Sequence, residues 1–147
     1  MGRLSYDLGN IYRALGVEPH NSSGLFWTLQ RSTDDLRAKP IVPPAGYQHA
    51  LEAIDEVTAA LPRAQLDRPD AALIAREFAQ TVRLLQHACR RGLYAHNPSP
   101  ALAHELADDL HAIVGEYREV WLARNRPGGL ADSVARLEQA LGDYQAA

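Results

Sequence analysis

The stretch VWLARNRPGGLADS, residues 120–133, joins two apolar-patterned segments through arginines, a proline and two glycines. One possibility is an anion-binding loop at the start of a helix, in which the free backbone N–H groups of the first turn bind the anion. A phosphate loop, however, follows a strand and ends in Gly-Lys-Ser or Gly-Lys-Thr, which this stretch does not do. A helix-ending turn accounts for the residues better. Arg124 and Arg126 suit the carboxyl end of a helix dipole, the proline cannot continue that helix, and Gly128 and Gly129 reverse the chain.

Helical spacing of apolar residues dominates both sides of this turn. One helix is expected over about residues 99–125 and another from residue 130 onward, with apolar stripes at Leu102, Leu106, Leu110, Ile113, Tyr117, Val120 and Trp121, and at Leu130, Val134, Leu137, Leu141 and Tyr144. A further long helix is expected over about residues 69–92. At 1.5 Å per residue the two longest helices would measure roughly 35–40 Å. Their short connections make neighbouring helices antiparallel.

The N-terminal half shows shorter helical patterns. Helices are expected over residues 4–15, through Leu25, Phe26 and Leu29, and over residues 47–61, the first closed by Gly16. Three prolines interrupt residues 32–46, which predicts an irregular surface crossing. The sequence therefore predicts one all-α domain over residues 1–147, a bundle of five to six helices with long antiparallel C-terminal helices.

Composition narrows the function classes. The chain has 147 residues, a net charge of −3 and 46% apolar residues, so it lacks the basic excess of a nucleic-acid binder. Its single cysteine excludes an internal disulfide and a cysteine-based zinc site. No apolar run reaches the ~18 residues of a membrane span, and the N-terminus does not resemble a secretory signal. We expect a cytoplasmic protein without a nucleic-acid or membrane partner.

A metal site is the first chemical alternative. His104, Asp108 and His111 share one helix face at a spacing that suits a divalent metal. That face lies opposite the apolar stripe, where few groups could orient the ligands. We therefore expect no metal and no cofactor. The remaining histidines are expected in loops or on polar faces, without a chemical role: His20, His49, His87 and His96.

Nucleophilic or acid–base catalysis is the second alternative. Cys89 falls on an apolar stripe and is expected to be a buried, inert thiol, with Arg90 and Arg91 pointing away from it. The neighbouring carboxylates Asp55 and Glu56 point about 100° apart on a helix and cannot face one bond. We expect no catalytic residue in this chain.

A third pattern is a series of arginines. Arg76, Arg83 and Arg90 recur every seven residues along one polar face. Such a row could form a partner-binding strip, but a solvated face is the expected explanation.

Two motifs resemble a known family. The segment from Glu116 to Tyr144, with Trp121, Arg124, Asn125, Arg126, Gly128 and Gly129, resembles the C-terminal helical region of bacterial β-N-acetylhexosaminidases of glycoside hydrolase family 20. The N-terminal stretch from Asp7 to Phe26 is similar to the segment that follows the catalytic barrel of those enzymes. The resemblance implies an appended helical domain that packs on the barrel or mediates dimer contacts. A (β/α)₈ barrel needs ~250 residues, so this chain lacks one and inherits no catalytic residue.

The leading hypothesis is therefore a non-catalytic C-terminal domain cut from a longer glycoside hydrolase, whose partner is its own catalytic barrel. The apolar spacing that starts directly at the N-terminus supports the idea of a piece of a longer chain. The alternative is a free-standing helical interaction module without catalysis. A domain separated from a barrel exposes an apolar patch, for which Tyr6, Tyr12 and Trp27 are candidates. We expect a homo-oligomer, such as a dimer.

Overall fold

The computed structural model describes residues 2–17, 22–59, 61–64 and 66–145. In this part of the chain the fold is all-α, without strands, as predicted. Its helices are α1 (Gly2–Gly9), η1 (Ile11–Leu15), α2 (Gly24–Gln30), α3 (Thr33–Ala38), α4 (Pro44–Thr58), η2 (Leu61–Arg63), α5 (Ala71–His96), α6 (Pro100–Arg124) and α7 (Leu130–Gln145). The two η elements are 3₁₀ helices. The described residues thus hold more helices than the five to six expected, because two N-terminal segments are divided and α3 forms in a segment that was expected to be irregular.

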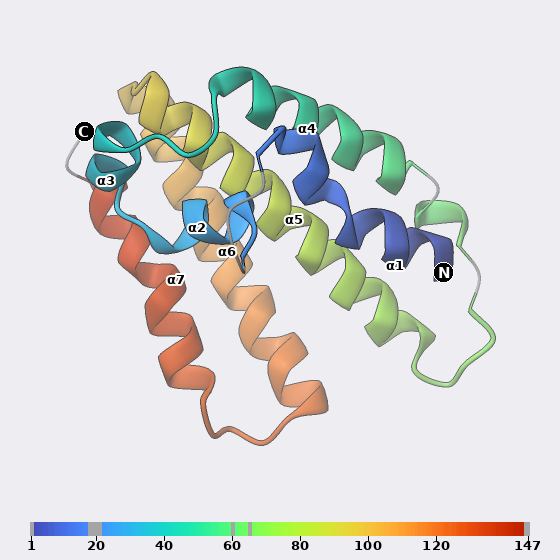
Figure 1. The fold of residues 1–147 in the computed structure, drawn as a ribbon. Coiled ribbons are helices and arrows are strands. Elements are labelled where there is room, and N and C mark those ends of the chain that lie inside the picture. Colours follow the sequence, from blue (N-terminus) through green and yellow to red (C-terminus); the bar gives the residue numbers. More distant parts are fainter. Residues whose placement is uncertain (1, 18–21, 60, 65, 146–147) are drawn as a thin grey trace.

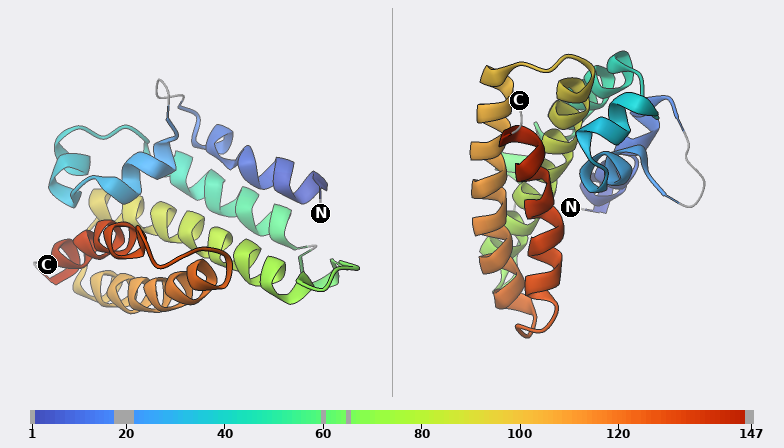
Figure 2. Two further views of the ribbon diagram at one scale, coloured as in Figure 1. Left: turned by 90° about the horizontal axis from the view of Figure 1, so that it is seen from below. Right: turned by 90° about the vertical axis from the view of Figure 1, so that its left-hand side faces the viewer.

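The long helix α5 runs through the middle of the molecule (Figures 1 and 2). On one side it packs against α6, which packs in turn against α7, and these three helices form an antiparallel C-terminal bundle. On its other side lie α1, η1, α2, α3 and α4. Two clusters of buried side chains match this division: one lies between α5 and the N-terminal elements, and the other within the C-terminal bundle.

Local signals set most of the helix ends. Ser23, Ser32 and Ser99 precede α2, α3 and α6, and each side-chain oxygen accepts a hydrogen bond from a backbone N–H of the first turn. Pro44 occupies the first turn of α4, where its missing N–H is not needed. Gly16 closes η1 with a φ of 70°, as the sequence predicted.

Two expectations for the N-terminal half were wrong. The segment 4–15 is not one helix, because α1 ends at Gly9 and the tighter η1 follows. The segment 32–46 is not an irregular crossing: it contains α3, and it buries Leu36 and Val42 in the core. The first proline of this segment comes after α3 ends, so the prolines do not prevent that helix.

The boundaries of two further helices also differ. The helix expected over 47–61 is α4, which begins at Pro44 and ends at Thr58, while Leu61 belongs to η2. The helix expected to stop at Gly92 continues to His96. Gly92 lies inside α5, and the position requires glycine because a Cβ there would collide with the ring of Tyr47. Its role is close packing between α4 and α5 rather than helix termination.

Candidate functional site

The connection between α6 and α7 is a turn, as predicted (Figure 1). The indole Nε1 of Trp121 donates to the carbonyl of Arg126 at 3.0 Å, and the backbone N–H of Asn125 donates to the carbonyl of Trp121 at 2.8 Å. Gly129 has a φ of 81°, which reverses the chain, while Gly128 is not among the positive-φ glycines. The turn is closed by its own residues, and its chemistry is structural.

Arg124 has partners that the sequence did not reveal. Its Nε and Nη2 donate to the two carboxylate oxygens of Glu77 at 2.6 and 3.0 Å, and its Nη1 donates to Asp70 at 2.8 Å. These hydrogen bonds lower the pKa of both carboxyl groups. Arg124 therefore holds the end of α6 against the beginning of α5, and its guanidinium is not available to an anion.

The arginines spaced by seven residues are not a free solvated face. Arg76 pairs with Glu116 and Glu119, Arg83 with Asp109, and Arg90 with Glu105, and every partner lies on α6. The partners run backward along α6 as the arginines run forward along α5, as antiparallel neighbours require. These ion pairs join α5 to α6, so the row is occupied within the chain.

A buried polar cluster, formed by His87, Arg91, Asp109, Asp143 and Tyr144, is the feature that the sequence analysis missed. The side chain of His87 is fully buried, with Nδ1 2.8 Å from Asp109 and Nε2 3.0 Å from the hydroxyl of Tyr144. Since an ionised carboxylate only accepts, Nδ1 donates to Asp109. The expectation that His87 lies on a polar face was wrong.

Arg91 is the second member of this cluster that was misplaced. It is 1% exposed, and it donates to the carbonyl oxygens of Thr28 and Arg31 and to the carboxylate of Asp143. The carboxylate of Asp143 also accepts from the backbone N–H of Thr33. Helix α5 is covered on two faces, so a residue opposite one apolar stripe lies against other helices. The small residues Ala88, Gly92 and Ala95, spaced by four and three positions around Arg91, are the sequence signal that other helices pack closely on this part of α5.

The pKa values in the cluster follow from burial and pairing. Burial raises the pKa of Tyr144. Burial also raises the pKa of Asp109, but hydrogen bonds from His87 and Arg83 outweigh it and hold that pKa below its ordinary value. Both ring nitrogens of His87 are occupied by neighbours, so the ring has no nitrogen left for a substrate. The cluster attaches α7 to α5 and α6.

The other candidate groups are in their expected environments. His104 and Asp108 lie 3.5 Å apart on an exposed face, and His111 is exposed too. Among the described residues no group of three or more His, Cys, Asp or Glu side chains is placed to hold a metal ion. Cys89 is buried, which raises the pKa of its thiol to about 12. Asp55 and Glu56 are exposed, and Asp55 accepts a hydrogen bond from Gln86.

Two of the remaining histidines are described. His49 is exposed, and the Nε2 atom of His96 lies 2.9 Å from the carbonyl oxygen of Val42. His20 lies outside the described residues.

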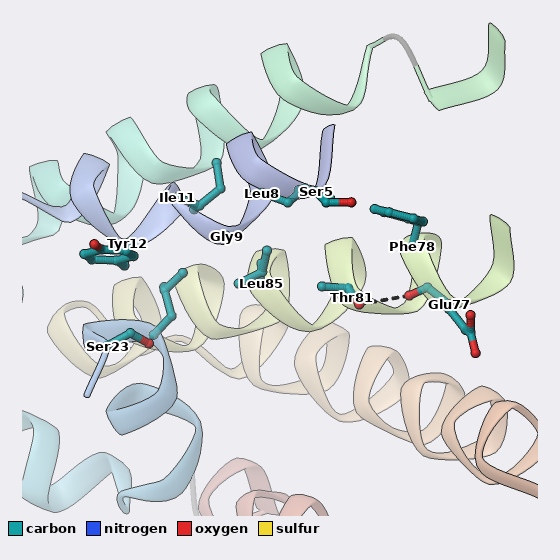
Figure 3. Close-up of a pocket in the computed structure, with 11 residues that line it drawn as sticks. Ser5, Leu8, Gly9, Ile11, Tyr12, Ser23, Glu77, Phe78, Thr81 and Leu85 are labelled. Atoms are coloured by element: carbon teal, nitrogen blue, oxygen red, sulfur yellow. Dashed lines mark hydrogen bonds between the residues drawn. The ribbon is translucent and has the colours of Figure 1, made fainter. Parts of the chain in front are cut away.

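An open apolar hollow, here called the N-terminal groove, lies between α1, η1, α2 and α5 (Figure 3). It encloses about 500 Å³. Its lining is mainly apolar, with a few hydroxyl groups and one carboxylate: Ser5, Leu8, Gly9, Ile11, Tyr12, Ser23, Leu25, Glu77, Phe78, Thr81 and Leu85. Tyr12 and Ser23 lie toward one end, and Phe78, Thr81 and Glu77 toward the other.

Exposed aromatic side chains occur on the elements that form this groove. Tyr6 on α1 is 65% exposed, and Phe26 and Trp27 on α2 are 52% and 37% exposed. Tyr12 is half-buried and lines the groove. We call these four residues the aromatic surface. The expectation that Tyr6 and Trp27 are exposed is confirmed, and Phe26 was not predicted.

No helix in the described ranges is both long enough and apolar enough to span a membrane. No protein-family model matches the chain, and no curated protein or solved structure is significantly similar to it.

Proposed function

We propose that this chain is a non-catalytic helical docking domain that binds a partner through its aromatic surface. The observation that carries the proposal is the exposure of Tyr6, Phe26 and Trp27 on the elements around an apolar groove. Aromatic side chains are enriched at protein interfaces because they bury a large apolar area with few rotatable bonds. The buried polar side chains His87, Asp109 and Tyr144 are hydrogen-bonded to one another between the helices of the bundle.

The narrower form of the proposal rests on the sequence resemblance alone. In that form the partner is the catalytic barrel of a family 20 glycoside hydrolase, and the chain is its C-terminal accessory domain. The motif residues Trp121, Arg124, Asn125 and Gly129 then serve as the structural turn of that domain. Sequencing the gene upstream of Met1 tests this form, since an in-frame barrel-coding region supports it and a stop codon directly upstream rejects it. The stop codon would favour the free-standing interaction module.

For the isolated chain, the available partner is a second copy. We expect sedimentation equilibrium to show a dimer at high protein concentration. The double variant Phe26→Ser, Trp27→Ser should shift the monomer–dimer equilibrium toward the monomer. Leu122→Ser is the matched control, because Leu122 is 51% exposed but lies on α6 near the α6–α7 turn. A wild-type chain that stays monomeric, or a control that weakens the dimer equally, would contradict docking between copies.

Absence of catalysis is tested separately. We expect the isolated chain not to hydrolyse an aryl N-acetyl-β-glucosaminide, because it has no barrel. Turnover that persists through repeated purification would overturn the non-catalytic assignment.

A further inference from the structure

The N-terminal groove has the size and lining of a small-molecule site. Its volume of about 500 Å³ lies within the ~300–1,000 Å³ that is typical of such sites. Leu8, Ile11, Leu25 and Leu85 form aliphatic walls, and Phe78 adds an aromatic side chain at one end (Figure 3). Gly9 lines the hollow from α1, and a Cβ built at this position has open space around it, with no atom within 4 Å.

The charges around the groove favour an uncharged ligand. Among the described residues that line it, Glu77 is the one that carries a charge. Both oxygens of its carboxylate are bound by Arg124, at 2.6 and 3.0 Å. A ligand carboxylate or ammonium group would therefore lose its hydration without gaining a charged partner.

Two of the four hydroxyl groups that line the groove, those of Ser23 and Thr81, give the ligand a direction. The Oγ of Ser23 accepts from the backbone N–H of Phe26 at 3.1 Å, and within the described part of the chain its O–H is left to donate. The Oγ1 of Thr81 donates to the carbonyl of Glu77 at 2.9 Å, so its lone pairs remain to accept. Ser23 lies toward the Tyr12 end and Thr81 nearer to Phe78 (Figure 3).

We propose that the N-terminal groove binds an uncharged, mainly apolar small molecule, with a hydrogen-bond acceptor toward Ser23 and a donor toward Thr81. This site does not depend on the docking function, because its walls and hydroxyl groups come from one chain.

The first test compares two uncharged probes by calorimetry in mildly acidic buffer. 4-Hydroxychalcone has a ketone acceptor and a phenol donor, whereas 4-methoxychalcone has the same acceptor without the donor. We expect one molecule of the hydroxy probe to bind per chain, and to bind more tightly than the methoxy probe. Thr81→Val, which keeps the shape but removes the acceptor, should reduce this difference. Equal binding of both probes to the wild type would contradict the proposed orientation.

The second test fills the groove. Gly9→Leu should weaken binding of the hydroxy probe by about tenfold or more, since the side chain occupies the hollow. Thr81→Trp should fill it from α5 and have a similar effect. Gly115→Leu is the matched control, because Gly115 also has no atom within 4 Å of a built Cβ but lies on α6. Retained binding in both filled variants, or tighter binding of the anionic dye anilinonaphthalene sulfonate, would overturn the proposal.

Sedimentation of the same samples separates this site from docking. Because Tyr12 belongs to both the aromatic surface and the groove, probe binding is measured at a concentration at which the chain is monomeric. Dimer formation at high concentration with no probe binding by the monomer would support the proposed function and reject the ligand site. Probe binding by a chain that stays monomeric at high concentration would support the ligand site and contradict docking between copies.

Discussion

Arg91, on α5, contacts α2 and α7 directly and α3 through Asp143. Its guanidinium lies between α2 and α7 and binds two carbonyl oxygens and the carboxylate of Asp143. That carboxylate also binds the backbone of Thr33 at the start of α3. A buried charge is tolerated only when it is paired and hydrogen-bonded, so the packing of α2, α3 and α7 on α5 depends on this pair.

Asp143→Ala should lower the free energy of unfolding by about 3–5 kcal/mol, because it leaves the buried guanidinium of Arg91 without its counter-charge. Urea denaturation of the purified variant measures this loss. Asp132→Ala is the control, since Asp132 is an exposed carboxylate on the same helix and its loss should cost only a few tenths of a kcal/mol. Similar stability of the two variants would show that the buried pair contributes little.

Cys89 gives a second prediction at this scale. Its thiol is buried and has a pKa of about 12, so at neutral pH it is both inaccessible and protonated. We expect a thiol reagent such as Ellman's reagent to react with it at least about a hundredfold more slowly in the native protein than in denaturant. Fast reaction under native conditions would argue against this burial.

At the scale of the helix, close packing decides the effect of a glycine. Gly92→Ala should destabilise the protein by about 1–3 kcal/mol, because the new Cβ overlaps the ring of Tyr47 and forces α4 and α5 apart. Gly115→Ala in α6 should instead stabilise it by about 0.5–1 kcal/mol, since the site is open and alanine favours the helix. Thermal denaturation of the two variants should shift the midpoint in opposite directions. A stabilising Gly92→Ala would contradict this contact.

The sequence predicted the long elements well. Helices α6 and α7 begin and end close to their expected positions because Ser99, Pro100 and the turn at 125–129 are local signals. The N-terminal half was less predictable, since the helices that precede α4 have only five to eight residues and their apolar periodicity covers about two turns. Helix α3 has six residues, and its position depends on the burial of Leu36 and Val42 against other elements.

At the scale of the whole molecule, ion pairs connect the C-terminal bundle. Asp109 lies between Arg83 on α5 and the buried His87. Its pKa is lowered in the folded protein, so it contributes stability that is complete above its ordinary value of 3.8 and lost as pH falls through the lowered pKa. Hydrogen bonds from arginines also lower the pKa values of Glu77, Glu116 and Asp70. These carboxylates therefore also contribute stability that is lost on acidification.

We therefore expect the free energy of unfolding to decrease on acidification, between about pH 5 and pH 2. Asp109→Asn should lower stability at neutral pH by about 1–3 kcal/mol, because two hydrogen bonds lose their charged acceptor. It should also make the acid-dependent decrease shallower than in the wild type. Urea titrations at a series of pH values measure both effects, and an unchanged slope for Asp109→Asn would contradict the assignment.

Little of the candidate site could be predicted from the sequence. The burial of Cys89 was expected because the residue falls on an apolar helical stripe. The exposure of Tyr6 and Trp27 was expected because aromatic side chains favour interfaces. The N-terminal groove was not, since Gly9, Ser23 and Phe78 meet there only after three segments have packed together. The buried polar cluster around His87 was missed for the same reason.

By itself the sequence determined that this protein is all-α, where α6 and α7 begin and end, and that residues 120–133 form a turn. These properties depend on residues within a few positions of one another. The tertiary structure alone decided that Arg124 binds Glu77, that His87 and Arg91 are buried, and that α1, α2 and α5 leave a groove open. Such contacts join residues that are distant along the chain, and helical periodicity carries no information about which faces meet.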